Sequence, residues 1–426
     1  MHLCRKTTLT FLVLVSSIFL FSDSAQARRG KTTFSKMTIE DVGLSGKTVL
    51  IRVDFNVPLK DGVITDDTRI RAALPTIQYA LEQGAKIVLT SHLGRPKGEV
   101  VPELSLAPIA RRLSELLGIN VGIAPDCIGN EVESMVSNLR ESEILLLENI
   151  RFHSEETEND PVFARSIASL ADVFVNDAFG SSHRAHASVV GVADYLPTVS
   201  GYLLDKEITY FEQILNAPEH PFYAILGGAK VSDKIAVIEN LLNLADKIFI
   251  GGGMAYTFLA AQGIEIGNSK LEEDNIELAR GLLAKAAEMG KEIILPIDHI
   301  VAEEMSEDAE VQIVTEIPEG MIALDIGPQT RELFKEALGD AGMVVWNGPL
   351  GFFEIDAFSH GSRDIAEFIA SLDAIKVVGG GDTASCIESF GLIDGFSHIS
   401  TGGGASLEYL EGKILPGVSI INTQSD

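Results

Sequence analysis

The sequence predicts an α/β protein built from two doubly wound, Rossmann-like parallel-sheet domains. From about residue 48 onward, short and continuously apolar runs rich in Val and Ile alternate with helical patterns. Strands that are apolar on both faces and separated by helices are typical of parallel sheets covered on both sides. A chain of 426 residues is also too long for one compact core, which favours two domains.

Each element of this prediction is assigned from its own pattern. The candidate strands are Val49–Phe55, Lys86–Thr90, Ile144–Leu147, Val173–Asn176, Phe222–Leu226, Lys247–Ile250, Ile293–Pro296, Met343–Trp346, Lys376–Val378 and His398–Ser400. The candidate helices are Leu74–Gln83, Leu106–Leu117, Pro161–Leu170, Leu203–Leu215, Asp233–Asn243, Asp274–Met289, Arg331–Leu338, Ser362–Ser371 and Thr383–Ser389. We place the domain boundary near Pro197–Gly201, so that the next helix bridges the two halves.

The composition is that of a globular protein, with 46% hydrophobic and 22% charged residues. The net charge of −28 argues against a nucleic acid or an anionic membrane as partner, because both require a basic surface. The cysteines, Cys4, Cys127 and Cys386, are widely spaced and form no CxxC pair. Neither a zinc site nor a disulfide framework is indicated, which suits a reducing compartment.

At first sight, the N-terminus contradicts a location in a reducing compartment. Basic residues precede the apolar run Leu9–Phe21, and Ala25-Gln26-Ala27 follows as a cleavage site, which is the layout of a secretory signal peptide. Alternatively, translation starts at Met37. In either case we exclude residues 1–36 from the fold, and no other apolar run is long enough to span a bilayer.

In the first half, acids, an amide and cations follow the strands. Ligands of doubly wound sheets bind beyond the carboxyl ends of the strands, so these are the positions to examine. Arginine suits bidentate recognition of carboxylate and phosphate, and we expect a small, multiply negative ligand here. Each Arg by itself is better interpreted as a surface ion pair, but four separate strand ends that each offer Arg, His or both favour a ligand site. The segments are Asp54–Pro58, Arg69, Ser91–Pro96, Glu148–His153, Asp177–Gly180 and His183–His186.

His92, His183 and His186 could suggest a metal site. Their neighbours are cations and no carboxylate accompanies them at ligand spacing, so we do not expect a metal there.

In the second half, glycines follow the strands instead. Gly379-Gly380-Gly381-Asp382-Thr383 joins an apolar strand to a helix, whose first N–H groups can bind a phosphate. Asp382 could hold a divalent metal against that phosphate. Taken alone, the stretch is better interpreted as a turn with a capping Asp, and the related segments favour the phosphate site. Related segments are Gly227–Lys234, Gly251–Met254, Asn347–Gly351 with Glu354, and Gly402–Gly404.

Two common nucleotide motifs are absent. Gly43–Thr48 has the wrong spacing for a P-loop and precedes a strand, and no GxGxxG opens a βαβ unit. The second absence weakens the alternative of a nicotinamide-dependent dehydrogenase.

Taken together, these segments resemble the phosphoglycerate kinase family from about Met37 to the C-terminus. The resemblance is carried by Arg52–Pro58, Ser91–Pro96, Glu148–Phe152, His183–Ser188, Gly227–Lys234, Gly251–Thr257, Trp346–Glu354, Gly379–Thr383 and Ser400–Ser406. Departures such as Ser181-Ser182 and Thr330 touch no expected ligand-binding residue. The leader is the main departure.

The resemblance implies a role for each site residue. The 3-phosphoglycerate site would comprise Asp54, Phe55, Asn56, Arg69, His92, Leu93, Gly94, Arg95, Arg151 and Arg184. ATP or ADP with Mg²⁺ would be bound by Gly228, Lys230, Lys234, Gly252, Asn347, Pro349, Glu354, Gly380, Gly381, Asp382 and Thr383, with Asp382 on the metal and Glu354 on the ribose. The expected catalytic groups are Arg69, Lys230, Gly380 and Gly403.

The resemblance also implies two domains joined by a helix, with a cleft between them. The expected ranges are 37–200 for 3-phosphoglycerate, 201–217 for the helix, 218–405 for the nucleotide, and 406–426 returning to the first domain. We expect a cytoplasmic monomer that transfers a phosphoryl group reversibly between ATP and a carboxylate. The alternative, suggested only by the leader, is an exported surface-binding protein on the same fold.

Overall fold

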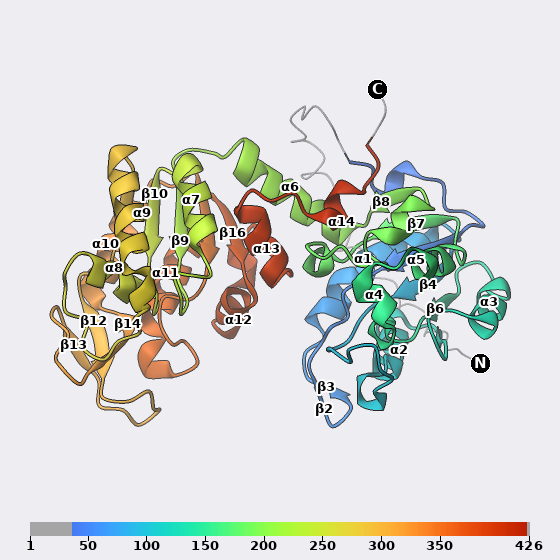
Figure 1. Cartoon of the computed structure of the whole chain (residues 1–426), viewed down its shortest axis with the longest axis horizontal. Coiled ribbons are helices and arrows are strands. Elements are labelled where there is room, and N and C mark those ends of the chain that lie inside the picture. The colour runs from blue at the N-terminus through green and yellow to red at the C-terminus, as the bar shows by residue number, and fades with distance from the viewer. Residues whose placement is uncertain (1–35, 424–426) are drawn as a thin grey trace, which may run out of the picture. The chain divides into compact units, whose positions relative to one another are not determined.

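The computed structural model describes residues 36–423, coloured by position along the chain in Figure 1. The expected leader therefore lies outside the described residues except for Lys36. Met37–Asn422 form one compact unit. Separately from it, Lys36 and Thr423 form an antiparallel bridge with each other.

The first half contains a six-stranded sheet in the order β5-β6-β4-β1-β7-β8, with every pair parallel. Its strands are β1 (Thr48–Arg52), β4 (Lys86–Thr90), β5 (Val121–Ile123), β6 (Ile144–Leu146), β7 (Val173–Asn176) and β8 (Thr198–Ser200). The α-helices along this part are α1 (Thr68–Glu82), α2 (Ala107–Leu117), α3 (Asn130–Ser137), α4 (Ser154–Glu158) and α5 (Pro161–Ala168). A hairpin, β2 (Leu59–Lys60) with β3 (Val63–Ile64), follows β1.

Both faces of this sheet are buried, which explains its continuously apolar strands. Val49 and Ile51 of β1 pack into one core cluster with residues of α1 and α2. Leu50, between them, packs into a different cluster with residues of α3 and α5. Because successive strand residues point to opposite faces, an unbroken apolar run is what this architecture requires.

The second half repeats the design, in the order β11-β10-β9-β15-β16-β17 and again fully parallel (Figure 1, yellow-green to red). The strands are β9 (Phe222–Leu226), β10 (Lys247–Ile250), β11 (Glu292–Ile294), β15 (Met343–Asn347), β16 (Ile375–Gly379) and β17 (His398–Ile399). The helices are α7 (Ile235–Leu244), α8 (Ala255–Ala261), α9 (Ile276–Glu288), α10 (Pro328–Leu338), α11 (His360–Ser371), α12 (Gly381–Ser389), α13 (Gly403–Leu410) and α14 (Pro416–Ser419).

The α/β class and the two parallel sheets are thus confirmed, and all ten predicted strands are present, four with the predicted bounds and six with shifted ends. Strands β5 and β8, which are three residues long, were not expected from the sequence. Nor was a small antiparallel sheet in the order β13-β12-β14, made by β12 (His299–Ala302), β13 (Gln312–Val314) and β14 (Ile322–Ile326). Three-residue strands such as β5, β8 and β13 give too few residues for a period to be read.

Helix α6 (Tyr202–Asn216) contacts elements of both halves. Its first residue, Tyr202, packs edge-on against Tyr79 of α1 at a ring distance of 5.6 Å. Farther along, Phe211 packs against Tyr409 of α13 at 5.5 Å. The helix begins directly after β8, where the sequence analysis expected a bridging helix.

The end of the chain bonds to residues of the first half. Asn176 donates from Nδ2 to the carbonyl of Gly417 at 2.8 Å, and the N–H of Asn422 donates to the carbonyl of Thr198 at 3.0 Å. The expected limit between residues 405 and 406 falls inside α13, so this helix cannot be divided there. Among the described residues, no helix is both long and apolar enough to cross a membrane.

Candidate active site

Three polar groups meet just beyond the end of β1. Asp54 follows that strand, and Arg69 lies in the first turn of α1. Arg69 donates from Nη1 to Oδ1 of Asp54 and to the carbonyl of Asn56, both at 3.3 Å. The arginine is about one-third exposed, so its other guanidinium N–H groups can face a ligand.

Asn56 links this group to the loop after β4. Its Oδ1 accepts from the N–H of Gly94 at 2.9 Å. The carbonyl of the same glycine accepts from Nη1 of Arg151 at 2.9 Å. The Nε of Arg151 is buried without a partner among the described residues, which leaves a charged donor for an anion.

His92 is a neutral donor in this group. It is buried, and Nη2 of Arg52 lies 3.2 Å from its Nδ1. Since a guanidinium only donates, Nδ1 must accept and the ring proton is on Nε2. Burial, with smaller effects from nearby charges, lowers the pKa of His92 to about 3.

Asp54 is ionised despite being nearly covered. Burial raises its pKa, but its neighbours His92, Arg69 and Arg52 lower it by more, so that it lies below the usual range. Because His92 is neutral near pH 7, the two arginines supply the attraction there. The aspartate orients these cations and neutralises part of their charge.

Gly180 lies against this carboxylate. A Cβ added to it would be 2.5 Å from Oδ2 of Asp54, closer than real carbon atoms approach. Any larger residue would displace the aspartate.

The other expected substrate residues divide into two kinds. Arg95 and Arg184 are exposed and form no ion pair among the described residues, so both are available to bind an anionic ligand. Phe55 and Leu93 are instead core residues, 0% and 3% exposed. The N–H of Phe55 donates to Ser91 Oγ at 2.8 Å, and both backbone groups of Leu93 bond to Asn149. These two residues pack in the core and hold the loops that carry the site, and their side chains do not face a ligand.

A buried ionic network, for which the sequence predicted no role, lies behind this site. Arg52 is 0% exposed and donates from Nε to Ser188 Oγ at 2.9 Å, and that hydroxyl donates to Glu156 at 2.7 Å. An arginine ending an otherwise apolar strand was a usable signal for Arg52. Glu156 stands in an acidic run with nothing to distinguish it.

At the second sheet, three glycine-rich loops pack backbone against backbone. The N–H of Gly227 donates to Asn347 O at 3.0 Å, and the N–H of Gly228 donates to Pro349 O at 2.9 Å. The N–H of Gly252 donates to Leu350 O, also at 2.9 Å. Gly228 and Gly348 have φ values of +94° and +98°, a conformation that favours glycine. The loops can approach this closely because no side chain intervenes.

A partly buried lysine and a buried asparagine lie at the centre of these loops. Nζ of Lys234 donates to Oδ1 of Asn347 at 2.7 Å. Nδ2 of Asn347 is buried without a partner among the described residues, so it has a hydrogen bond to offer. Burial lowers the pKa of Lys234, while Asp233 and Asp382 raise it less.

Helix α12 presents its N-terminus beside this pair. Gly380 turns the chain at a φ of +95°, and Thr383 holds the turn by accepting from Gly348 N at 2.6 Å and donating to Gly379 O at 3.0 Å. Gly403, which starts α13, comes so close that an added Cβ would be 3.5 Å from the N–H nitrogen of Gly381. Two helix N-termini therefore converge, which suits an anion.

Asp382 is the available metal ligand at this position. It lies in the first turn of α12 and is exposed, and no side-chain capping bond forms at the N-cap, Gly380. A carboxylate that is free and next to an anion-binding helix end fits the oxygen ligands that Mg²⁺ prefers.

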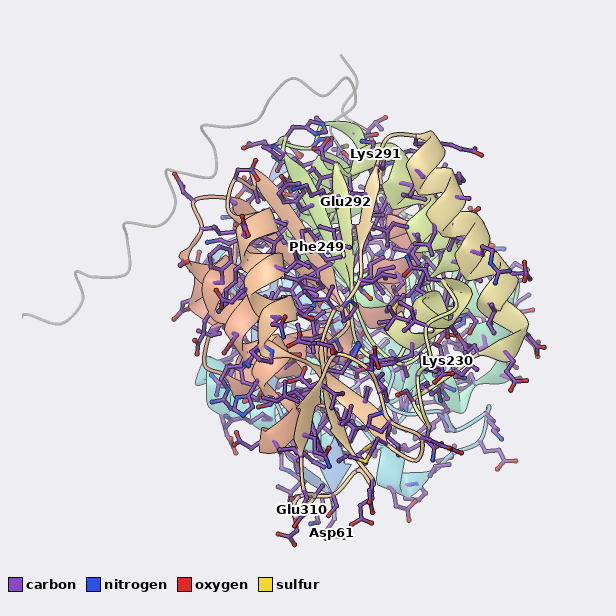
Figure 2. The ribbon with its side chains drawn as sticks, turned by 90° about the vertical axis from the view of Figure 1, so that its left-hand side faces the viewer. Asp61, Lys230, Phe249, Lys291, Glu292 and Glu310 are labelled. Carbon is purple, nitrogen blue, oxygen red and sulfur yellow. The ribbon has the colours of Figure 1, made fainter. Side chains whose placement is uncertain are left out.

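Lys230 and Glu354 lie on exposed parts of the loops after β9 and β15. In Figure 2, Lys291 and Glu292, next to the start of β11, lie near the top, Phe249 of β10 lies below them, and Lys230 lies lower still. Lys230 is therefore at the carboxyl ends of the strands, where ligands of such sheets bind.

Comparison with known proteins decides the family. A sequence profile described as phosphoglycerate kinase matches residues 39–413. The chain belongs to the phosphoglycerate kinase family. A phosphoglycerate kinase of Clostridium botulinum (strain Alaska E43 / Type E3) is 54% identical over 393 residues, covering 91% of this chain and 99% of the relative. One of Moorella thermoacetica is 56% identical over 386 residues, covering 90% and 98%.

Solved phosphoglycerate kinases also share the fold. The structure from Coxiella burnetii is 43% identical with a TM-score of 0.84, covering 91% of this chain and 99% of that one. The structure from Pyrococcus horikoshii OT3 is 34% identical with a TM-score of 0.80, covering 90% and 98%. The family assignment makes this chain a phosphotransferase of glycolysis, and the alternative of a surface-binding protein gains no support from the comparisons.

Proposed function

We propose that the chain transfers a phosphoryl group reversibly between ATP and the carboxylate of 3-phosphoglycerate, giving 1,3-bisphosphoglycerate and ADP. One observation supports this most strongly. Unpaired cationic donors lie at the carboxyl edge of one sheet, and a glycine-lined pair of helix N-termini lies at the same edge of the other. The first arrangement suits a small anion, and the second suits a nucleotide phosphate.

The acceptor needs no general base, because a carboxylate is already ionised near neutral pH. The site agrees with this, since its one buried histidine, His92, is held neutral by burial and acts as a donor. Arg69, Arg151 and His92 would bind and orient the acceptor. Catalysis would then rest on in-line positioning and on neutralising the charge that spreads over the transferred group.

On the nucleotide side, Lys230 and the N–H groups near Gly380 and Gly403 would face the transferred phosphoryl group. Lys234 and Asn347 would hold the phosphates and Glu354 the ribose. Asp382 would hold Mg²⁺, which supplies charge neutralisation on the phosphate oxygens when it is bound.

We further propose that the enzyme closes on binding both ligands, since its two anion-binding sites lie on different sheets and water must be excluded from the transfer. We place it in the cytoplasm as a monomer, with ATP or ADP and 3-phosphoglycerate as its small-molecule partners. Small-angle scattering should show compaction only when both ligands are present.

A coupled assay tests the reaction. The purified chain should consume ATP only when 3-phosphoglycerate and Mg²⁺ are both supplied, and chelation of Mg²⁺ should abolish turnover. ATP consumption that is equal with and without 3-phosphoglycerate would contradict the acceptor. N-terminal sequencing of the native protein separates a start at Met37, which favours the cytoplasm, from a start at Arg28, which favours export.

A further inference from the structure

A second cluster of ligand-type side chains lies apart from the phosphoryl-transfer residues. It consists of Asp126, Cys127 and His153, whose ligand atoms all lie within 4.8 Å of one another. We propose that this cluster is a binding site for a borderline divalent cation of the Zn²⁺ class, with the carboxylate, the thiolate and the imidazole as ligands.

Two neighbouring strands bring the three residues together. Asp126 and Cys127 follow β5, and His153 follows the turn after β6, its parallel partner. The two loops are joined by the bond from the N–H of Ala124 to Leu146 O at 2.8 Å. The cluster is thus built at the carboxyl edge of the sheet, on loops anchored by the strand ladder.

The individual contacts hold the ligand atoms in place. Nε2 of His153 lies 2.6 Å from Oδ1 of Asp126, and the N–H of Cys127 donates to the same oxygen at 2.6 Å. The imidazole also packs against the ring of Phe163 at a centroid distance of 5.0 Å. The orientation of the imidazole is therefore restrained from two sides before any cation arrives.

The thiol is the least expected member. Cys127 is 0% exposed, and its Sγ donates to the carbonyl of Glu148 at 2.9 Å. The imidazole and carboxylate are 23% and 48% exposed, so a cation can enter from their side and reach the sulfur. The phosphoryl-transfer proposal uses none of these three groups.

The spacing is compatible with tetrahedral binding. Ligand atoms bonded at about 2.0–2.3 Å in a tetrahedron lie about 3.5 Å apart, so displacements of around 1 Å suffice. A cation would take the place of the hydrogen that His153 and Asp126 share. The imidazole would then lose its proton at Nε2 and carry one at Nδ1 instead, and the thiol proton would leave to solvent. Three protein ligands leave a further position for water.

Ligand type selects the cation. Sulfur and nitrogen favour Zn²⁺ or Co²⁺ over the hard Mg²⁺ and Ca²⁺, which prefer oxygen. Burial raises the pKa of the Cys127 thiol, and negative Asp126, Glu156 and Glu148 add to this. The same negative potential attracts a cation. Since the thiol must lose its proton on binding, affinity should rise with pH.

Co²⁺ is the probe, because thiolate ligation gives a charge-transfer band. The experiment uses the full chain, untagged, metal-stripped and free of nucleotide, in a Cys4→Ser background that leaves Cys127 and Cys386 as the only thiols. We expect one equivalent of Co²⁺ to produce the band, Zn²⁺ to abolish it, and excess Mg²⁺ to leave it intact.

Variants assign the ligands. Cys127→Ser should lose the band, whereas Cys386→Ser, the matched change at the other buried cysteine, should keep it. Because Cys127→Ser can disturb the core, His153→Gln at a partly exposed position provides a second test, and it should lose the rise in Tm that Zn²⁺ gives the parent. Absence of the band in the folded parent at pH 8, or its persistence in Cys127→Ser, overturns the proposal.

Discussion

In the first half of the chain, the guanidinium of Arg52 lies 3.2 Å from Nδ1 of His92, and both side chains are buried. This contact determines the tautomer of the histidine, because a guanidinium can only donate. It also opposes protonation of the ring, alongside burial. His92 therefore provides an uncharged Nε2–H donor in a site otherwise lined with arginines.

The first prediction concerns pH and stability. The folded pKa of His92 is about 3 and the unfolded value 6.5, so below pH 6.5 the unfolded chain binds a proton that the folded chain does not. The free energy of unfolding should therefore decrease as the pH falls from about 6.5 to about 3. Between pH 7 and pH 5 the neutral, buried ring of His92 should lower it by about 2 kcal/mol.

Denaturant unfolding at the two pH values measures this effect. The parent should lose about 2 kcal/mol more than His92→Gln, which cannot titrate. His360→Gln, at an exposed histidine, serves as the control and should behave as the parent does. Equal losses in the parent and in His92→Gln would show that the ring is protonated in the fold.

The second prediction concerns Arg69, which we propose as a cationic clamp on the transferred group. Arg69→Ala should lower turnover by roughly 10²-fold or more, the scale of losing one transition-state donor. Arg71→Ala is the matched control, because Arg71 lies on the same helix but points to solvent and pairs with Asp67. An unchanged kcat in Arg69→Ala, measured in the coupled assay, would remove this residue from catalysis.

The third prediction follows from the packing of Gly180 against Asp54. Gly180→Ala should displace the aspartate and reduce kcat/KM for 3-phosphoglycerate, by up to roughly 10²-fold for a shift near 1 Å. The KM for ATP should change little. Gly281→Ala, in the exposed face of α9 with no atom within 4 Å of the new Cβ, should instead stabilise the fold by about 0.5–1 kcal/mol. Normal kinetics in Gly180→Ala would mean that Asp54 can move without consequence.

The fourth prediction separates metal binding from helix capping at Asp382. Asp382→Asn should weaken binding of the Mg²⁺-nucleotide by about tenfold or more, since even changes beyond the direct ligands cost this much. Because the side chain is exposed, the unfolding free energy should change by less than about 1 kcal/mol. Calorimetric titration with and without Mg²⁺ measures the affinity for the nucleotide.

Asp373→Asn is the control, because Asp373 precedes the start of β16, at the end of the strand opposite to Asp382. A loss of stability without a loss of affinity would assign the residue to capping.

The small sheet β13-β12-β14 and the strands β5 and β8 escaped prediction for a physical reason. Strands β5, β8 and β13 have three residues each, too few to show a period. Strands β12 and β14 are longer, but they are specified by pairing with each other across the small sheet. Helix α6 and the ten predicted strands carry apolar patterns that can be read locally.

The division between sequence and structure is clearest at the active site. Residue type and position along the chain were enough to place Arg69, Arg151, Lys234 and Asp382 after strands and at helix starts, because the ends of parallel strands share one edge. Only the tertiary structure decided which side chains face a ligand and which support it: Phe55 and Leu93 lie in the core, while Arg52 and Glu156 form a buried network. Burial, tautomer and pairing depend on groups brought together from distant segments, and no local pattern records those distances. The same holds for Cys127, which is an isolated thiol in the sequence and lies beside Asp126 and His153 only once β5 and β6 have paired.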